Sequence, residues 1–288
     1  MVEAPLPPPH PDPHAPSQLL VPPAACDTHC HIFGPEARFP YRADAPYRPA
    51  ETPLERYRQM ADRLGLERAV FVQPVVYGTD HAAMLDALAR GNGRYAGVAI
   101  LDDDVSDIGL ERLHAAGVRG ARLNFVGHLS ARPSRDATMR VAHRISGLGW
   151  HLVFHVDAAA LLTEADMIAT LPCDFVIDHM ARVTAAEGVG QPAFAQLLDL
   201  ARDPRCWIKI SAGDRMTQGD LAIAIPFMRA IAMASPDRTM WGTDWPHPNV
   251  HWMPDDGDLI DLLATAVPDE SARNAILVTN PARLYDFH

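Results

Sequence analysis

The chain has 288 residues, of which 48% are apolar and 21% charged, and its formal net charge is −11. This composition supplies a buried core and excludes a disordered protein, and the acidic balance argues against nucleic acid and anionic membranes as partners. No apolar run approaches the roughly 20 residues that span a bilayer, and no signal peptide is evident. The four cysteines lack zinc-ribbon spacing, so we expect reduced thiols in a cytoplasmic protein.

Residues 1–23 are dense in proline, with His10 and His14 among the prolines. We expect this N-terminal extension to lie extended on the protein surface or to be disordered. Residues 24–288 show no second zone of composition, which predicts a single domain there.

Short apolar segments alternate with amphipathic ones through this domain. We expect helices near residues 54–64, 79–89, 106–116, 134–148, 158–171, 192–201, 221–234, 256–266 and 269–277. We expect strands near residues 27–31, 69–73, 95–101, 118–124, 151–155, 174–179, 206–211 and 240–244. Eight strand–helix repeats predict one (β/α)8 TIM barrel, with a doubly wound open sheet as the alternative.

A long irregular segment, residues 33–53, follows the first predicted strand. Loops of this length within a compact domain are usually functional or disordered. We expect a lid or wall of the active site, with Tyr41, Tyr47 and Arg48 as candidate substrate contacts. The alternative is that the tyrosines only anchor the loop.

Histidines and one aspartate stand at the C-terminal ends of four predicted strands, where barrel enzymes keep their chemistry. His29 and His31 are two residues apart, so on a strand they point to the same face. His155, His179 and Asp244 end three other strands. Three imidazoles and a carboxylate are typical of a catalytic zinc-type site, and Asp244 could also deprotonate the attacking water as general base.

Two arginines fall near the same strand ends. Arg122 alternates with apolar residues in the fourth strand, and Arg215 follows the seventh. A guanidinium binds carboxylate or sulfonate through two parallel hydrogen bonds, so both are candidate substrate contacts. The alternatives are a buried structural ion pair for Arg122 and a surface salt bridge for Arg215.

Four motifs fall on their expected strands: Asp-Thr-His-Cys-His at 27–31 with Phe-Gly-Pro at 33–35, Gly-Val-Arg-Gly-Ala-Arg-Leu-Asn-Phe at 117–125, Asp-His-Met at 178–180, and Trp-Gly-Thr-Asp-Trp-Pro-His-Pro-Asn at 241–249. Together they resemble the amidohydrolase superfamily, in its branch of 2-pyrone-4,6-dicarboxylate lactonase-like hydrolases. The resemblance runs from about Ala25 to Tyr285. It implies a (β/α)8 barrel that hydrolyses acidic lactones in the catabolism of aromatic compounds.

The resemblance also implies residue roles. The catalytic set it implies is His29, His31, His179 and Asp244. The substrate contacts it implies are Arg122, Arg215 and Tyr47. In this assignment His179 polarises the lactone carbonyl and Asp244 activates water.

Two positions depart from the pyrone branch. His155 stands where the metal-free enzymes carry tyrosine, so we expect one divalent metal, Zn or Mn, held by His29, His31, His155 and Asp244, with a metal-free mechanism as the alternative. The strand-four lysine of binuclear relatives is absent, because Lys209 is the only lysine in the chain. Gly127 and His128 replace a second arginine, which makes His128 a candidate substrate contact.

These observations predict a hydrolase that opens a muconolactone- or pyrone-type ring bearing carboxylate or sulfonate. The substrate is expected to be a small anionic lactone, and a homo-oligomer is possible. Alternatives are a metal-dependent decarboxylase of an aromatic or muconate acid, a lactone isomerase, and a ligand-binding barrel without activity.

Overall fold

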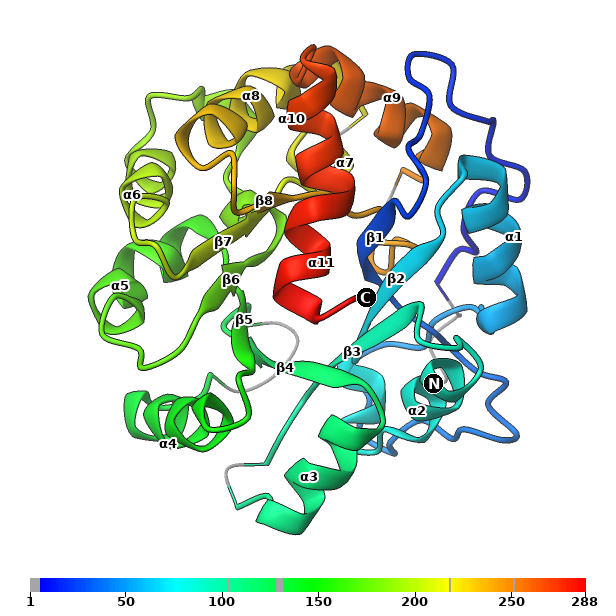
Figure 1. The fold of residues 1–288 in the computed structure, drawn as a ribbon, viewed down its shortest axis with the longest axis vertical. Coiled ribbons are helices and arrows are strands. Elements are labelled where there is room, and N and C mark those ends of the chain that lie inside the picture. The colour runs from blue at the N-terminus through cyan, green and yellow to red at the C-terminus, as the bar shows by residue number, and fades with distance from the viewer. Residues whose placement is uncertain (1–5, 103, 128–131, 218, 251) are drawn as a thin grey trace.

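The computed structural model describes residues 6–102, 104–127, 132–217, 219–250 and 252–288. Its centre is one sheet of eight parallel strands in chain order, surrounded by helices (Figure 1). The strands are β1 Cys26–Cys30, β2 Arg68–Val72, β3 Tyr95–Ala99, β4 Val118–Asn124, β5 His151–His155, β6 Phe175–Ile177, β7 Cys206–Lys209 and β8 Thr239–Met240.

Backbone hydrogen bonds join the last strand to the first. Thr28 N donates to Trp241 O at 3.1 Å, and Asp244 N donates to His29 O at 2.8 Å. Gly242 makes this approach possible, because a Cβ there would lie 2.7 Å from His29 N. The sheet therefore closes, which confirms the predicted TIM barrel and excludes the open sheet.

The helices follow the predicted alternation. They are α1 Leu54–Leu64, α2 Ala82–Ala89, α3 Asp107–Ala115, α4 Arg135–Ser146, α5 Ala158–Ile168, α6 Pro192–Leu200, α7 Gly213–Thr217, α8 Ile225–Ala234, α9 Asp256–Ala266, α10 Glu270–Asn274 and α11 Asn280–Tyr285. Local signals explain several ends: Ser106 Oγ accepts a hydrogen bond from Gly109 N at the start of α3, and Gly65 ends α1 at φ 79°.

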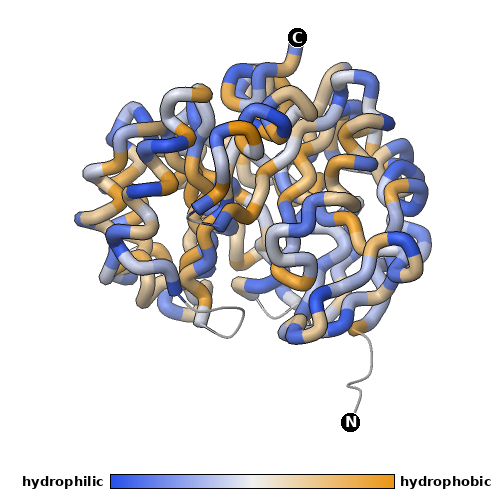
Figure 2. The backbone as a smooth tube through the Cα atoms, turned by 90° about the horizontal axis from the view of Figure 1, so that it is seen from below, coloured by the Kyte–Doolittle hydropathy of each residue, from blue (hydrophilic) through white to orange (hydrophobic). Residues whose placement is uncertain are grey.

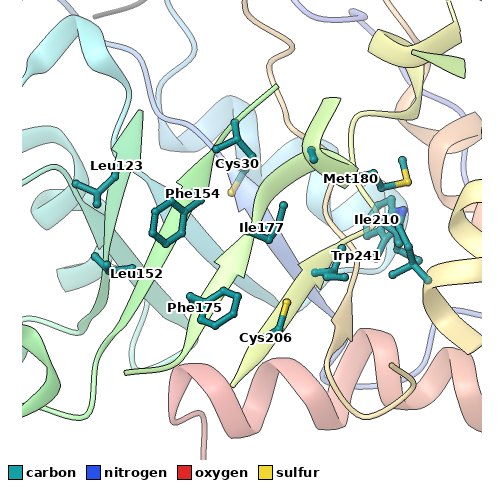
Figure 3. Packing of buried hydrophobic residues seen from close by; sticks show 14 of the residues in the cluster. Cys30, Leu123, Leu152, Phe154, Phe175, Ile177, Met180, Cys206, Ile210 and Trp241 are labelled. Atoms are coloured by element: carbon teal, nitrogen blue, oxygen red, sulfur yellow. The ribbon is translucent and has the colours of Figure 1, made fainter. Parts of the chain in front are cut away.

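Alternate residues of each strand face two different cores. On β5, Leu152 and Phe154 belong to the larger cluster, which includes buried residues of the surrounding helices. Figure 3 shows both side chains beside their neighbours from adjacent strands. Val153 belongs to the smaller cluster inside the barrel. His151 and His155 share its face of the strand, one at each end, so the barrel interior is apolar in the middle and polar toward its ends.

The C-terminal segment closes the N-terminal end of the barrel. Tyr285 and Phe287 join the interior cluster, and the ribbon of α10 and α11 runs across the barrel end that faces the viewer in Figure 1. The predicted end of the last helix at residue 277 is wrong, because helical structure continues through residues 275–279 into α11. The C-terminal end of the barrel is therefore the end that can hold an active site.

Part of the N-terminal extension is bonded to the barrel wall. Ser17 N and Oγ donate to Asp261 on α9, and His14 N donates to Asp255 at 3.1 Å. The division into residues 1–23 and 24–288 stays a prediction. Hydrophilic and hydrophobic stretches alternate along the coloured part of the tube in Figure 2. The described helices include none long and apolar enough to cross a membrane.

Candidate active site

Three histidines surround one oxygen of Asp244 at the C-terminal end of the barrel. The Nε2 atoms of His29, His31 and His179 lie 3.6, 3.5 and 3.7 Å from Asp244 Oδ1. All four side chains are buried. β1 and the first residue after it supply two of the histidines, so the predicted convergence of the first and last strands is what the structure shows.

The other oxygen of Asp244 is bound by Arg215. Arg215 Nε and Nη2 both lie 2.7 Å from Asp244 Oδ2, and Nη2 also donates to Pro248 O at 2.8 Å. Burial opposes ionisation of the carboxyl, but the charge of Arg215 and the neighbouring histidines together outweigh it and hold the pKa of Asp244 well below its usual range. Arg215 thus fixes the carboxylate so that Oδ1 faces the histidines.

A left-handed turn places His179. The predicted strand through residue 179 is wrong at its end, because β6 stops at Ile177 and His179 to Arg182 adopt φ of 53°, 52°, 55° and 47°. Four successive non-glycine residues in this region are costly and persist only where the surroundings hold them. His179 Nδ1 is held by Ser211 Oγ at 2.8 Å, which leaves Nε2 toward Asp244.

The same turn brings Arg182 to His155. Arg182 Nη1 donates to His155 Nε2 at 3.3 Å, and the His155 ring meets His179 edge-on with centroids 5.7 Å apart. Burial, then the charge of Arg122, lowers the pKa of His155 well below its usual value, so the imidazole is neutral and accepts this bond. His155 is close to the cluster, but its Nε2 is directed to Arg182 rather than to Asp244.

The site opens into a pocket that is lined by several arginine side chains. Its lining is His31, Tyr47, Val75, Arg122, His155, His179, Arg182, Arg215, Asp244, Pro248 and Asn249. Tyr47 therefore faces the pocket, whereas the Tyr41 ring lies tilted against the Tyr77 ring, with centroids 5.1 Å apart, and anchors the loop. His128 lies outside the described residues.

Arg122 Nε lies 3.8 Å from Asp178 Oδ2, too far for a hydrogen bond. Arg122 therefore has both features considered from the sequence: it forms a buried ion pair with Asp178, and its side chain also lines the pocket.

A second polar layer beneath His29 was missed by sequence reasoning. Lys209 Nζ lies 3.1 Å from Asp178 Oδ1, and both atoms lie 3.3 Å from His29 Nδ1. All three residues are fully buried. The signal was present: the only lysine of the chain stands within an apolar strand, and an aspartate directly precedes His179.

The cluster has the donor set of a divalent-metal site. Among the described residues, ligand atoms within 4.8 Å of one another come from His29, His31 and Asp244, and from His29, Asp178 and His179. His29 Nε2 is buried and has no hydrogen-bond partner among the described residues. Burial lowers the pKa of His179 to about 4 and that of His29 well below its usual value, so both are neutral, as metal ligands must be. This buried cluster could bind a metal.

Comparison with known proteins gives consistent matches over nearly the whole chain. The amidohydrolase family matches residues 26–287. The chain is 38% identical over 280 residues to 2-pyrone-4,6-dicarboxylate hydrolase of Comamonas testosteroni, covering 93% of this chain and 92% of that protein. It is 39% identical over 277 residues to 4-sulfomuconolactone hydrolase of Rhizobium radiobacter, covering 94% and 93%.

A solved structure agrees with these matches. A Pseudomonas putida protein described as a 2-pyrone-4,6-dicarboxylic acid hydrolase superposes with a TM-score of 0.81 at 31% identity, covering 94% of this chain and 99% of that one. The family resemblance expected from the motifs is confirmed. The chain belongs to the amidohydrolase family, in the branch that contains the 2-pyrone-4,6-dicarboxylate and 4-sulfomuconolactone hydrolases.

Proposed function

We propose that the protein hydrolyses the ring ester of a small anionic lactone. The observation that carries this proposal is the placement of one Asp244 oxygen among three imidazole Nε2 atoms, at the wall of a pocket that also presents three guanidinium groups. A carboxylate can accept a proton from water, and neutral imidazoles can donate to a carbonyl oxygen.

The reaction follows from these positions. A water between Asp244 and the ring carbonyl gives a proton to the carboxylate while its oxygen bonds to the carbonyl carbon. His179 donates to the carbonyl oxygen as negative charge develops there. The ring C–O bond then breaks, and Asp244 returns the proton to the departing ring oxygen, so the product is an open acid with a free hydroxyl or enol.

The arginines set the substrate's orientation. Arg122 and Arg182 project from separate strand ends into one pocket, and Arg215 keeps Asp244 ionised from the third side. Acidic substituents held by guanidinium groups fix the ring over the base. A related Acinetobacter baumannii structure, 27% identical with a TM-score of 0.83, contains bound citric acid, and an anion of that kind matches this charge pattern.

The residues fit one divalent cation, because an unpartnered buried nitrogen and two neighbouring imidazoles face one carboxylate oxygen. His29, His31 and Asp244 would hold it, with His155, the ligand predicted from the sequence, or His179 beside them. Nitrogen and carboxylate donors favour zinc or manganese. When bound, such an ion polarises a carbonyl and lowers the pKa of water.

The substrate test uses the purified chain with 2-pyrone-4,6-dicarboxylate, 4-sulfomuconolactone and 4-carboxymuconolactone. Ring opening is followed by loss of ultraviolet absorbance and by base uptake at constant pH. We expect turnover of at least one acidic lactone, and much slower turnover of the same ring without its acidic groups. Equal rates on neutral and acidic lactones would contradict the charge argument.

The cation test measures metal content and activity together. We expect about one equivalent of zinc or manganese, with activity lost on chelation and restored by the ion. Full activity without any bound metal would instead support hydrolysis by the histidines and Asp244 alone.

A lactone isomerase is the second candidate. The chain is 29% identical over 272 residues to D-galactarolactone isomerase of Agrobacterium fabrum. NMR of the product separates the two: an isomerase yields a new ring, whereas the hydrolase yields an open acid.

A further inference from the structure

The least explained group near the site is Lys209. It is fully buried on β7, and it is the only lysine among 25 cationic side chains. It does not line the pocket. A buried ammonium is expensive unless it is paired, so its position requires a reason.

Lys209 forms a closed triangle with two neighbours. Its Nζ lies 3.1 Å from Asp178 Oδ1 and 3.3 Å from His29 Nδ1, and Asp178 Oδ1 lies 3.3 Å from the same ring nitrogen. The ammonium can only donate and the carboxylate can only accept, whereas the imidazole nitrogen can do either. His29 Nδ1 therefore has a partner in each of its two neutral tautomers.

Each tautomer presents a different atom to the site. If Nδ1 carries the proton, it donates to Asp178, and Nε2 points a lone pair at the space beside Asp244. If Nε2 carries the proton, Nδ1 accepts from Lys209, and the site receives an N–H. In the part of the chain that the structure describes, Nε2 itself has no hydrogen-bond partner that would favour one tautomer.

The surroundings hold the backbone and Cβ of His29 in place. His29 N is held by Asp27 Oδ1 at 3.1 Å, and the backbone of Gly242 packs against the residue so closely that a Cβ would meet His29 Cβ at 3.0 Å. Asp178 Oδ1 lies 3.1 Å from Lys209 Nζ, so the two partners of His29 Nδ1 also hold each other. Both partners thus persist in fixed positions.

We propose that Lys209 and Asp178 are positioning residues that support both tautomers of His29, so that its Nε2 offers a lone pair to a divalent cation or an N–H to an oxygen when no cation is bound. The change moves one proton from Nε2 to Nδ1 through exchange with solvent, and the net charge of the protein alone is unchanged. This inference deepens the proposed function, but its main test does not depend on turnover.

That test is nitrogen NMR of the histidine rings in the wild-type chain. The His29 signals are identified by their absence in His29→Gln. In chelator-treated protein we expect a protonated Nε2 and an unprotonated Nδ1, and after addition of Zn²⁺ alone we expect a protonated Nδ1. The same tautomer in both samples would overturn the proposal, whatever the activity measurements give.

Two variants test the partners in opposite directions. Lys209→Met removes the donor, so His29 should carry its proton on Nδ1 with or without zinc, and zinc should bind about tenfold more tightly because a nearby positive charge is gone. Asp178→Asn weakens the acceptor and should loosen zinc by about 10- to 100-fold. Shifts of the zinc Kd in the same direction in both variants would indicate a merely structural role and overturn the assignment.

Discussion

The two ends of the barrel can be compared on a single strand. His151 and His155 lie on the same face of β5, one at each end, and both are buried. Burial lowers the pKa of both, to about 3 for His151. His151 packs edge-on against Tyr285 at 5.0 Å, and neither ring nitrogen has a hydrogen-bond partner. His155 instead meets Arg182 and His179 at a pocket.

Burial and a shifted pKa therefore do not by themselves define a site. The closed end has a perturbed histidine but is filled by Tyr285 and Phe287. At the open end, side chains from β4, β5 and the segments after β1, β6, β7 and β8 converge on shared space. Changes at the open end should therefore alter turnover, and changes at the closed end should alter stability.

The largest effect is expected for Asp244→Asn. The amide keeps the shape but cannot take a proton from water, so kcat should fall by about 1,000-fold or more. The control is His151→Asn at the closed end, for which kcat should stay within about threefold. Steady-state kinetics and circular dichroism of both variants check this; near-normal turnover of Asp244→Asn would refute the general-base role.

Phe287→Ala should lower stability without changing turnover. Phe287 is 9% exposed and seals the barrel interior, so its loss should lower the free energy of unfolding by about 3 kcal/mol. Urea unfolding measures this loss, and kcat/KM below the unfolding range should match the wild type. A large drop in kcat/KM would mean that the closed end controls the site.

Arg122→Met compares two arginines of one strand. Removing the guanidinium that lines the pocket should raise KM by about 10- to 100-fold, because a charged hydrogen bond to the substrate is lost. Its control is Arg119→Met on the same strand, which lies 3.7 Å from Asp286 at the closed end. If both variants changed KM equally, Arg122 would not contact substrate.

Low pH should lower the free energy of unfolding through the buried histidines at both ends of the barrel. The pKa of His179 is about 4 in the folded protein, below 6.5 for the free residue, so the unfolded state binds the proton first as pH falls. The free energy of unfolding should therefore fall below pH 6.5, by about 1 kcal/mol from this residue between pH 6.5 and 5.5. Urea unfolding of His179→Gln and His151→Gln at the two pH values should show a smaller loss in each; an unchanged loss in both would contradict the assignment.

The repeat pattern and the residues at the strand ends could be read from the amino-acid sequence. Apolar runs of strand length, separated by amphipathic helices, specify a parallel sheet, and the C-terminal strand ends of such a barrel must meet. The positions of His29, His31 and Asp244 near one another follow from that rule. The match to the family's motifs was likewise readable without coordinates.

Which side-chain atoms of the site face one another depends on tertiary contacts. The left-handed turn at His179 to Arg182 has no local signal, since none of its residues is glycine. Two sets of contacts join residues that are far apart in the sequence, by 29 to 180 positions. They are Arg215 with Asp244, and Lys209 with Asp178 and His29. Side-chain direction at a closed barrel depends on strand stagger and packing, and these are set by contacts across the whole chain rather than by neighbouring residues.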